Sequence, residues 1–347
     1  MTQYLHHVAQ PASPSSALEA EWLERRKKRL MSILSKGLPT LPSYLLDLNA
    51  LLSTATVDLR KVAKVIRTDP SLSAQVLRLC NSALFGLRCR VLSIGQAVVL
   101  LGTERLRTLV LTCAVMQFAG KHVPVKSLLG FWQHSFLTAL LCEHVARVVD
   151  YPEKEQAYLA GLLHDIGQLP LWMLVMEEQS RHKELPPEDW PDNIPVERSY
   201  FGMDHGKVGR WMAVAWNFMP SFMDVFENHH DPSHGQHDPY LLGIVSSVDQ
   251  FLKTQFVPEV AVDADNELPE IPQAMPHVEE PLLVGGASEG PTFLVHCFPN
   301  LSPAGRELVL ATLQAEYIQV LPLVQLGMAA VIPDAGGEPI SLQERKP

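Results

Sequence analysis

The run Leu162-Leu163-His164-Asp165-Ile166-Gly167 places an imidazole and a carboxylate side by side at the end of an apolar helix. A buried carboxylate without a partner costs several kcal/mol, which is on the order of the stability of a whole domain. We therefore expect His164 and Asp165 to have polar partners or a metal ion. The pair directs the search for further ligands along the chain.

Further side chains that can bind metal lie on apolar helical faces. Each stands at i, i+3, i+4 or i+7 from apolar residues, and this spacing turns it towards the core. These residues are His134, His205, His229 and Asp249, and His230 is adjacent to His229. Together with His164 and Asp165 they make seven groups that could converge between helices, as the metal sites of helical bundles do.

A single histidine on an apolar face is more often a hydrogen-bonded core residue than a ligand. The ordered series as a whole favours a shared metal pocket. Imidazole and carboxylate ligands without a thiolate suit iron, manganese, zinc or nickel. Seven ligands exceed what one tetrahedral ion needs, so the sequence allows a centre with one or two divalent metal ions.

The series resembles the HD superfamily of metal-dependent phosphohydrolases, whose name describes the His164-Asp165 pair, and more specifically the HDOD family of output domains in bacterial signalling proteins. The resemblance covers about residues 37 to 253. Its motifs are LPTLP at 38–42, DPSL at 69–72, NSALFG at 81–86, SIGQAVVLLG at 93–102, FWQHS at 131–135, FGMDH at 201–205 and NHHDP at 228–232. The resemblance implies a helical HD-like bundle with the seven residues as its metal ligands.

The substrate side of the chain departs from catalytic relatives. Position 168 is Gln, where the HD-GYP proteins that hydrolyse cyclic di-GMP usually carry a lysine that can meet substrate phosphate. No Gly-Tyr-Pro tripeptide follows, and Gly130 stands where some of those relatives have an additional acidic ligand. The ligands of HD-GYP proteins are thus retained while their substrate-binding side is not.

Composition bounds the class of protein. A chain of 347 residues, 47% of them hydrophobic, can bury a sizeable core in two or three domains. No apolar run approaches the roughly 18 to 20 residues that span a bilayer, so we expect no membrane segment. The five scattered cysteines indicate reduced thiols, as in a cytoplasmic protein. The net charge is −10, but eight acids lie between Lys253 and Arg306 without a basic residue. Without these eight acids the rest of the chain is nearly neutral. We therefore do not expect nucleic acid as a partner.

We predict an all-α chain in five parts. Residues 1–36 form an N-terminal helix or tail, whose basic run at 25–29 covers a solvated helix face or binds an anionic partner. Residues 37–124 form the N-terminal helical part and 125–257 the HD-like bundle, in which the stretch 184–191 is a loop that could lie over the site. An acidic Pro/Gly-rich linker, expected to be mobile, follows at 258–291. A C-terminal helical extension and tail at 292–347 opens its main helix after Ser302, and that helix is expected to pack on the bundle or on a partner.

Functions of two classes fit this sequence. The first is a signalling and docking module, in which the bundle, with or without metal, recognises other regulatory proteins through surfaces that include residues 81–86 and 102–107. The second is a metal-dependent phosphodiesterase or phosphatase acting on a nucleotide, with His164 and Asp165 at the centre of a site where metal ions activate water. Candidates for its substrate side are Gln168, Lys207 and Arg210, and no clear pair of cations lies near the motif. We predict the module without efficient hydrolysis; a nucleotide sensor that binds without turnover is a third reading.

Overall fold

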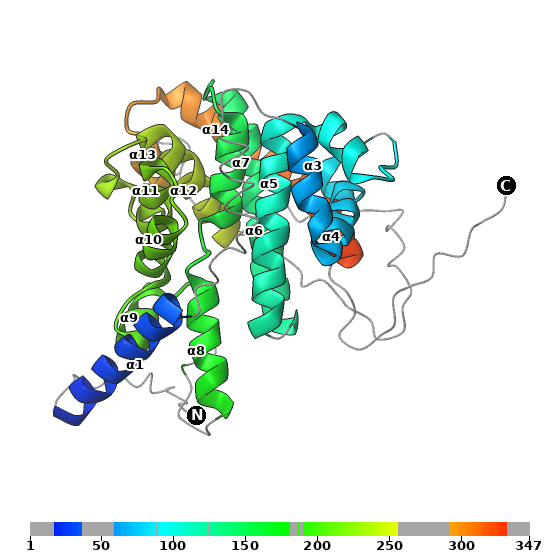
Figure 1. Cartoon of the computed structure of the whole chain (residues 1–347). Coiled ribbons are helices and arrows are strands. Elements are labelled where there is room, and N and C mark those ends of the chain that lie inside the picture. Colours follow the sequence, from blue (N-terminus) through cyan, green and yellow to red (C-terminus); the bar gives the residue numbers. More distant parts are fainter. Residues whose placement is uncertain are drawn as a thin grey trace, which may run out of the picture.

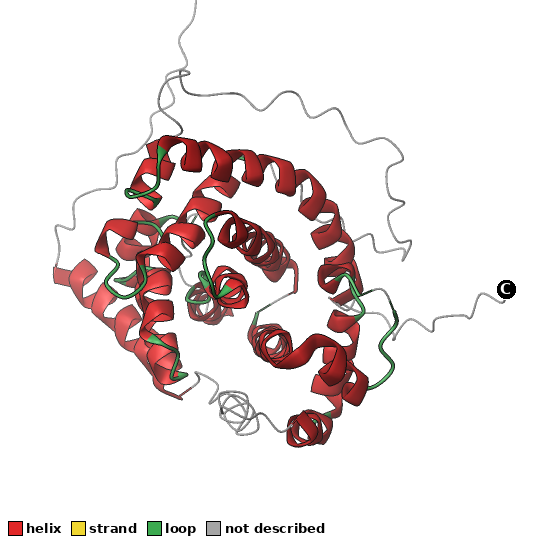
Figure 2. Ribbon diagram, turned by 90° about the horizontal axis from the view of Figure 1, so that it is seen from above, coloured by secondary structure: helices red, strands yellow, loops and turns green. Residues whose placement is uncertain are grey.

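The computed structural model describes residues 17–36, 59–87, 89–123, 125–180, 186, 190–255 and 292–331. Within these ranges every regular element is a helix and no strand occurs, which confirms the predicted all-α fold (Figure 2). The LPTLP motif and the predicted acidic linker lie outside the described residues, as does most of the stretch 184–191. The boundaries of the five predicted parts stay a prediction.

The N-terminal part consists of α3 (Leu59–Thr68), α4 (Pro70–Cys80), the short 3-10 helix η1 (Ala83–Phe85) and α5 (Ile94–His122). Family motifs build its turns. The Asp69 carboxylate caps α4 by accepting hydrogen bonds from the backbone N–H groups of Ser71 and Leu72, at 2.9 and 3.1 Å. Asn81 closes the next loop, because its side chain accepts from the Val91 N–H at 2.7 Å and donates to the Val91 carbonyl at 2.8 Å.

The HD-like bundle follows (Figure 1). Its helices are α6 (Val125–Val148), α7 (Lys154–Leu163), α8 (Gln168–Ser180), α9 (Ile194–Phe201), α10 (His205–Ala215), α11 (Pro220–Asn228), the 3-10 helix η2 (Pro232–His234) and α12 (Pro239–Lys253). The long helix α6 packs against α7 and α12, and α11 packs against α10 and α12. Phe136, Phe201 and Phe226 are among the largest fully buried side chains, so the apolar core runs through the whole bundle.

The N-terminal helix α1 (Ala17–Lys36) packs against α8 and α9. Arg26 from the basic run is only 3% exposed, and its Nη2 atom lies 2.8 Å from Glu178 Oε2. Its guanidinium also stacks on the ring of Tyr200, 3.3 Å from the centroid. The prediction of a solvated basic face was therefore wrong for Arg26, because its ion pair lies inside the contact between α1 and the bundle.

The C-terminal elements are α13 (Thr292–Cys297) and α14 (Pro303–Val331). Helix α14 packs along α6, as expected, and it also contacts α4 and η1 of the N-terminal part. A Cβ atom added at Gly327 would come within 2.5 Å of Leu84 Cγ, so this helix approaches η1 closely. The expectation that α14 packs on the bundle or on a partner did not include this contact, which covers part of the predicted docking surface at 81–86.

Two described stretches have the length and hydropathy of a membrane span, contrary to the expectation from the sequence. The first, Lys154–Ser180, covers α7 and α8, and 83% of its apolar window is buried inside the protein. The second, Pro303–Met328, lies in α14 and is 22% buried. A core helix of a globular protein passes the same test of length and hydropathy, because it is apolar on most of its faces.

Candidate metal centre

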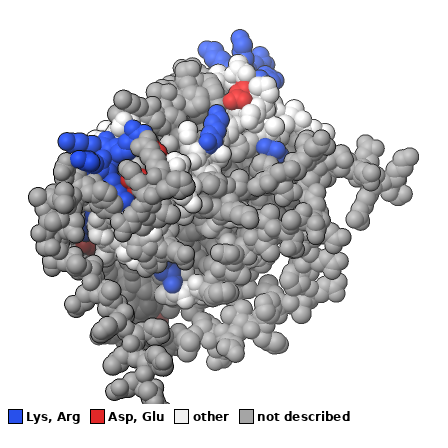
Figure 3. All heavy atoms as spheres, turned by 90° about the horizontal axis from the view of Figure 1, so that it is seen from below, with Lys and Arg blue, Asp and Glu red and all other residues white. Residues whose placement is uncertain are grey.

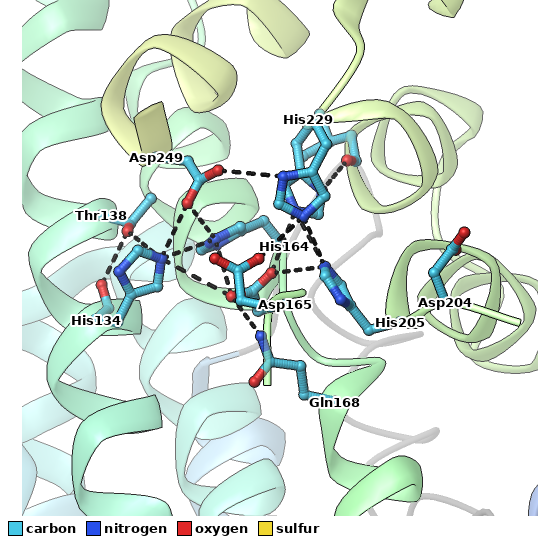
Figure 4. Close-up of polar contacts among 12 residues, drawn as sticks. His134, Thr138, His164, Asp165, Gln168, Asp204, His205, His229 and Asp249 are labelled. Carbon is cyan, nitrogen blue, oxygen red and sulfur yellow. Dashed lines mark hydrogen bonds and ion pairs between the residues drawn. The ribbon is translucent and has the colours of Figure 1, made fainter. Parts of the chain in front are cut away.

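The seven predicted ligands converge at the middle of the bundle (Figure 4). His134 projects from α6 and Asp249 from α12, whereas the other five stand at helix ends. His164 and Asp165 follow α7, His205 begins α10, and His229 and His230 follow α11. Gly167 permits the close approach of two of these ends. A Cβ atom at this position would overlap the carbonyl oxygen of His205 and lie 2.6 Å from the backbone nitrogen of Gly209.

Asp165 connects two groups of histidines. Its Oδ1 atom lies 3.2 Å from the Nε2 atoms of both His205 and His229. Its Oδ2 atom lies 3.4 Å from His164 Nε2 and 3.8 Å from His134 Nε2. One carboxylate thus faces four imidazoles, two through each of its oxygens.

The second carboxylate closes the group on the α6 side. Asp249 Oδ1 lies 3.3 Å from His134 Nε2 and 3.8 Å from His164 Nε2. Asp249 is fully buried and Asp165 is 3% exposed, and Oδ2 of Asp249 also lies 2.9 Å from the Lys253 ammonium. Buried oxygens of this kind normally have a donor or a cation as partner.

Three histidines are oriented by hydrogen bonds from the other ring nitrogen. Nδ1 of His164 donates to the Gly161 carbonyl at 2.7 Å, and Nδ1 of His229 donates to the Val225 carbonyl at 3.0 Å. Nδ1 of His205 donates to the Glu197 carboxylate at 2.8 Å. Because these oxygens can only accept, the Nδ1 atoms carry hydrogen and the Nε2 atoms face the centre. This is the arrangement of metal-ligating histidines and their supporting partners.

The electrostatics of the centre favour a cation. Burial opposes ionisation of Asp165, but the imidazoles of His164 and His205 outweigh it and hold the pKa of Asp165 well below its ordinary value. Burial likewise disfavours charge on His205, yet Asp165 and Glu197 raise the pKa of His205 well above its ordinary value. Burial and the adjacent His230 lower the pKa of His229 to about 3, so that ring is neutral. Two buried carboxylates whose pKa values lie below their ordinary value, together with the neutral His229 ring, fit a divalent ion.

Three charged residues at the centre, Asp192, Glu197 and Lys253, were not among the predicted site residues. Glu197 is fully buried and accepts from His205 twice, through the ring and through the backbone N–H at 2.7 Å. Lys253 Nζ lies 2.9 Å from Asp249 Oδ2 and 2.9 Å from Asp192 Oδ2. Only Lys253 could have been found from the sequence, because it stands four residues after Asp249 on the same helical face.

The predicted substrate-side residues do not all reach the centre. Gln168 does, since its amide donates to Asp165 Oδ2 at 2.9 Å. Arg210 instead forms an ion pair with Glu227 at 3.1 Å, and the Lys207 side chain is exposed. Both stand on other faces of α10 than His205. The structure therefore does not bring Lys207 and Arg210 to the centre, and the lysine that lies there is Lys253.

Comparison with known proteins agrees with this geometry. The profile of the HDOD domain matches residues 38–232, more than half of the chain. The chain belongs to the HDOD family. An uncharacterized protein of Treponema pallidum (strain Nichols) is 24% identical over 204 residues, which are 57% of this chain and 38% of that protein. The match thus spans well under half of that relative's length.

HDOD relatives of known structure share the fold at low sequence identity. A protein of Shewanella amazonensis SB2B, provisionally named a phosphohydrolase, superposes with a TM-score of 0.59 at 21% identity, over 87% of this chain and 98% of that one. A protein of Marinobacter aquaeolei VT8, provisionally named a signal transduction protein, superposes with a TM-score of 0.59 at 18% identity, over 91% of this chain and 66% of that one. At these identities the likeness concerns the fold alone.

Proposed function

We propose that this chain is a signal-transduction module whose HD-type pocket holds a divalent metal ion and which does not turn over a substrate efficiently. The observation that carries the proposal is the buried carboxylate of Asp165, whose Oδ1 atom faces the Nε2 atoms of His205 and His229 at 3.2 Å while both rings donate to other groups through Nδ1. An ion at this place would supply the missing partner. It would also stabilise the bundle, since a ligand bound only by the folded state adds stability by mass action.

Seven residues would hold the metal in two groups around Asp165. The first group is Asp165 with His134, His164 and Asp249, and the second is Asp165 with His205, His229 and His230. Nitrogen and carboxylate donors without thiolate suit iron, manganese, zinc or nickel. Bound metal can lower the pKa of a coordinated water towards neutrality, which is the chemistry that a hydrolase of this type needs.

The proposal of inefficient turnover rests on the contacts that Gln168 and Lys253 already make next to the centre. Gln168 brings a hydrogen bond to Asp165 but no positive charge. Lys253 lies at 2.9 Å from two carboxylates, those of Asp192 and Asp249. A phosphodiester substrate needs its negative charge offset and its orientation fixed. Within the described residues, the one lysine at the centre is thus already paired.

The docking role is supported by exposed apolar side chains. Leu92 and Val99 are each 74% exposed and Leu100 is 45% exposed, and the last two lie in the family motif at 93–102. Neighbouring exposed apolar residues are typical of protein contacts. On the face shown in Figure 3, the Lys and Arg side chains of the described residues form separate groups rather than one continuous patch. Other signalling proteins are accordingly the partners that we propose, rather than nucleic acid.

A metal-dependent phosphohydrolase acting on a cyclic or linear nucleotide is the second candidate. The observation that favours it is Lys253, a cation beside the centre that the sequence motifs did not indicate. In that case metal ions would activate water, and Lys253 would meet the substrate phosphate once it was released from its carboxylate partners. His164 and Asp165 would then be ligands of the catalytic metal.

One experiment separates the two candidates. The protein is purified without chelator, its metal content is measured, and iron-loaded and manganese-loaded samples are assayed against cyclic di-GMP, other cyclic dinucleotides and ppGpp. We expect bound metal and turnover well below about 1 per second, the lower end of ordinary enzyme rates. Faster turnover that disappears in His164→Ala would place the phosphohydrolase first. Protein that never binds metal would refute the metal-holding pocket.

A further inference from the structure

Asp192 lies at the mouth of the candidate metal centre, in the short segment before α9. Its Oδ2 atom is 2.9 Å from Lys253 Nζ, and its Oδ1 atom is 3.1 Å from His230 Nε2. The side chain is 27% exposed, so it stands between the buried ligands and solvent. We propose that Asp192 is an internal anion that occupies the position in which an external phosphate would bind Lys253.

The segment that carries Asp192 is held in place from both sides. Trp190 is 3% exposed, and its ring packs against those of Trp172 and Phe201, with centroid distances of 4.8 and 5.2 Å. The backbone N–H of Asp192 donates to Glu197 Oε1 at 3.1 Å, on the same carboxylate that orients His205. Asp192 is therefore positioned by the core and by the ligand network.

The backbone of Asp192 is unusual for a residue with a side chain. Its φ angle is 61°, in the left-handed region that costs most non-glycine residues energy. Such a conformation persists where the surrounding contacts impose it, and residues of this kind cluster at binding sites. Here the contacts are the ones to Glu197, His230 and Lys253. The strain is consistent with a carboxylate that is directed at a particular place.

His230 is oriented differently from the other histidines of the centre. The Lys253 ammonium has only donors, so Nδ1 of His230, at 3.1 Å, accepts from it. Without a bound ion, a neutral His230 ring then carries hydrogen on Nε2, which lies 3.1 Å from Asp192 Oδ1 and 2.9 Å from His205 Nε2. His164, His205 and His229 carry hydrogen on the opposite nitrogen. Asp192 Oδ2 thus pairs with the Lys253 ammonium, the donor that a bound anion would use, and Asp192 Oδ1 lies beside the His230 ring.

Carboxylate and phosphate present the same kind of face to these donors. Both offer two anionic oxygens that accept charge-assisted hydrogen bonds from ammonium and imidazole groups. Asp249 already contacts Lys253 on another side, so an incoming phosphate has to displace Asp192. This inference rests on the proposed function, because it gives a reason why a pocket that holds metal would not take up a phosphate substrate.

The test is calorimetric titration of the metal-loaded full chain with inorganic phosphate. Asp192→Gly removes the carboxylate and suits the left-handed backbone. We expect it to bind phosphate about tenfold more tightly than wild type or better, the range of a charge-assisted hydrogen bond. Asp150→Gly is the matched control, because Asp150 is an exposed acid with a φ angle of 53°. Its phosphate affinity should equal that of wild type.

Two further variants identify the group that phosphate binds. Asp192→Gly combined with Lys253→Gln should lose the gain in affinity, since the ammonium is absent. Asp192→Asn keeps the side-chain volume and tolerates the left-handed backbone, so its affinity should fall between those of wild type and Asp192→Gly. If Asp192→Gly and Asp192→Asn both bind phosphate no better than wild type, the inference is wrong.

The outcomes separate this inference from the proposed function. If Asp192→Gly loses its metal while Asp150→Gly keeps it, Asp192 is a metal ligand and the internal-anion role is refuted. If wild type binds no metal, the proposed function fails. The titrations of Asp192→Gly with and without Lys253→Gln then still decide the role of Asp192, because both ion pairs of Lys253 are with protein carboxylates. A gain in affinity that survives Lys253→Gln would also overturn the inference.

Discussion

The side-chain amide of Gln168 donates a hydrogen bond of 2.9 Å to Oδ2 of Asp165, and both residues are nearly fully buried. Gln168 is the first residue of α8, directly after the turn that carries the His164-Asp165 pair. It therefore fixes the orientation of the carboxylate that faces four imidazoles. At this position HD-GYP relatives usually carry a lysine, so one substitution exchanges an orienting amide for a charge.

Gln168→Lys tests that difference. A lysine could keep a contact to Asp165 and would add a positive charge that amide nitrogen lacks. We expect the metal-loaded variant to gain weak hydrolysis of cyclic di-GMP from none in wild type, as measured by product formation. Gln168→Met has similar length without charge and should stay inactive. A folded, metal-loaded Gln168→Lys variant without any turnover would show that more than this charge is missing.

Asp165→Ala removes the carboxylate that connects the two groups of histidines. If wild type holds metal, we expect the variant to lose it and to melt about 5 to 10 °C lower, the range for a ligand present well above its dissociation constant. Metal analysis and thermal unfolding measure both effects, and a chelator should reproduce the shift in wild type. An unchanged melting temperature with unchanged metal content would exclude Asp165 as a central ligand.

Gly167→Ala should disrupt the approach of α8 to α10. The added Cβ atom would overlap the His205 carbonyl and crowd the backbone nitrogen of Gly209, neither of which is a flexible side-chain end. We expect a loss of about 3 kcal/mol or more in the free energy of unfolding by urea, together with weaker metal binding. Gly120→Ala is the control, because no atom lies within 4 Å of its added Cβ atom. That helical position should be neutral or stabilised by up to about 1 kcal/mol.

Arg26→Ala should uncouple α1 from the bundle. It leaves the buried Glu178 carboxylate without its guanidinium, and breaking a buried pair in this way typically costs about 3 to 5 kcal/mol. Urea unfolding of Lys28→Ala, an exposed position on the same helix, should change by less than about 0.5 kcal/mol. The double variant Arg26→Met with Glu178→Leu should recover much of the loss. Equal stability of Arg26→Ala and wild type would contradict the buried pair.

Asp224 makes stability depend on pH in a predictable direction. Burial favours its neutral form, but hydrogen bonds from the N–H groups of Gln236 and His237 outweigh it and lower the pKa of Asp224 below its ordinary value. A lowered folded-state pKa stabilises the protein above the unfolded value of about 3.9, and this contribution is lost as the pH falls through the folded pKa. Asp224→Asn should therefore be less stable than wild type at pH 6, with the difference shrinking below about pH 4. Melting temperatures across this range give the measurement, and a constant difference at every pH would contradict it.

The ligands on helical faces were predictable because a helix repeats every 3.6 residues. Apolar neighbours at i+3 and i+4 indicate which side of α6 and α12 faces inward, and this places His134 and Asp249 without knowledge of the fold. The pairs at the ends of α7 and α11 were visible as motifs. The all-α fold followed from the same periodicity and from the family resemblance.

Contacts between residues that are far apart in the sequence could not be predicted from the local sequence. Arg26 meets Glu178 across 152 positions, so its basic neighbours in the run at 25–29 gave the wrong indication. Asp192 and Glu197 reach the centre through the packing of Trp190 and the cap of α9, which depend on tertiary contacts. The positions of Lys207 and Arg210 have a related explanation. Nearness in sequence to His205 does not bring Lys207 and Arg210 onto its face of the helix.

Helix α14 lies outside the segment that the HDOD profile matches, yet it packs against that segment. The HDOD profile ends at residue 232, but Pro303–Val331 covers α6 and touches α4 and η1, so its apolar face is shared by both parts of the domain. A chain cut back to the family match would leave Leu84 and the outer side of α6 open to water. The stretch recognised by homology is therefore shorter than the stretch whose helices pack together, and α14 contacts both parts of the domain.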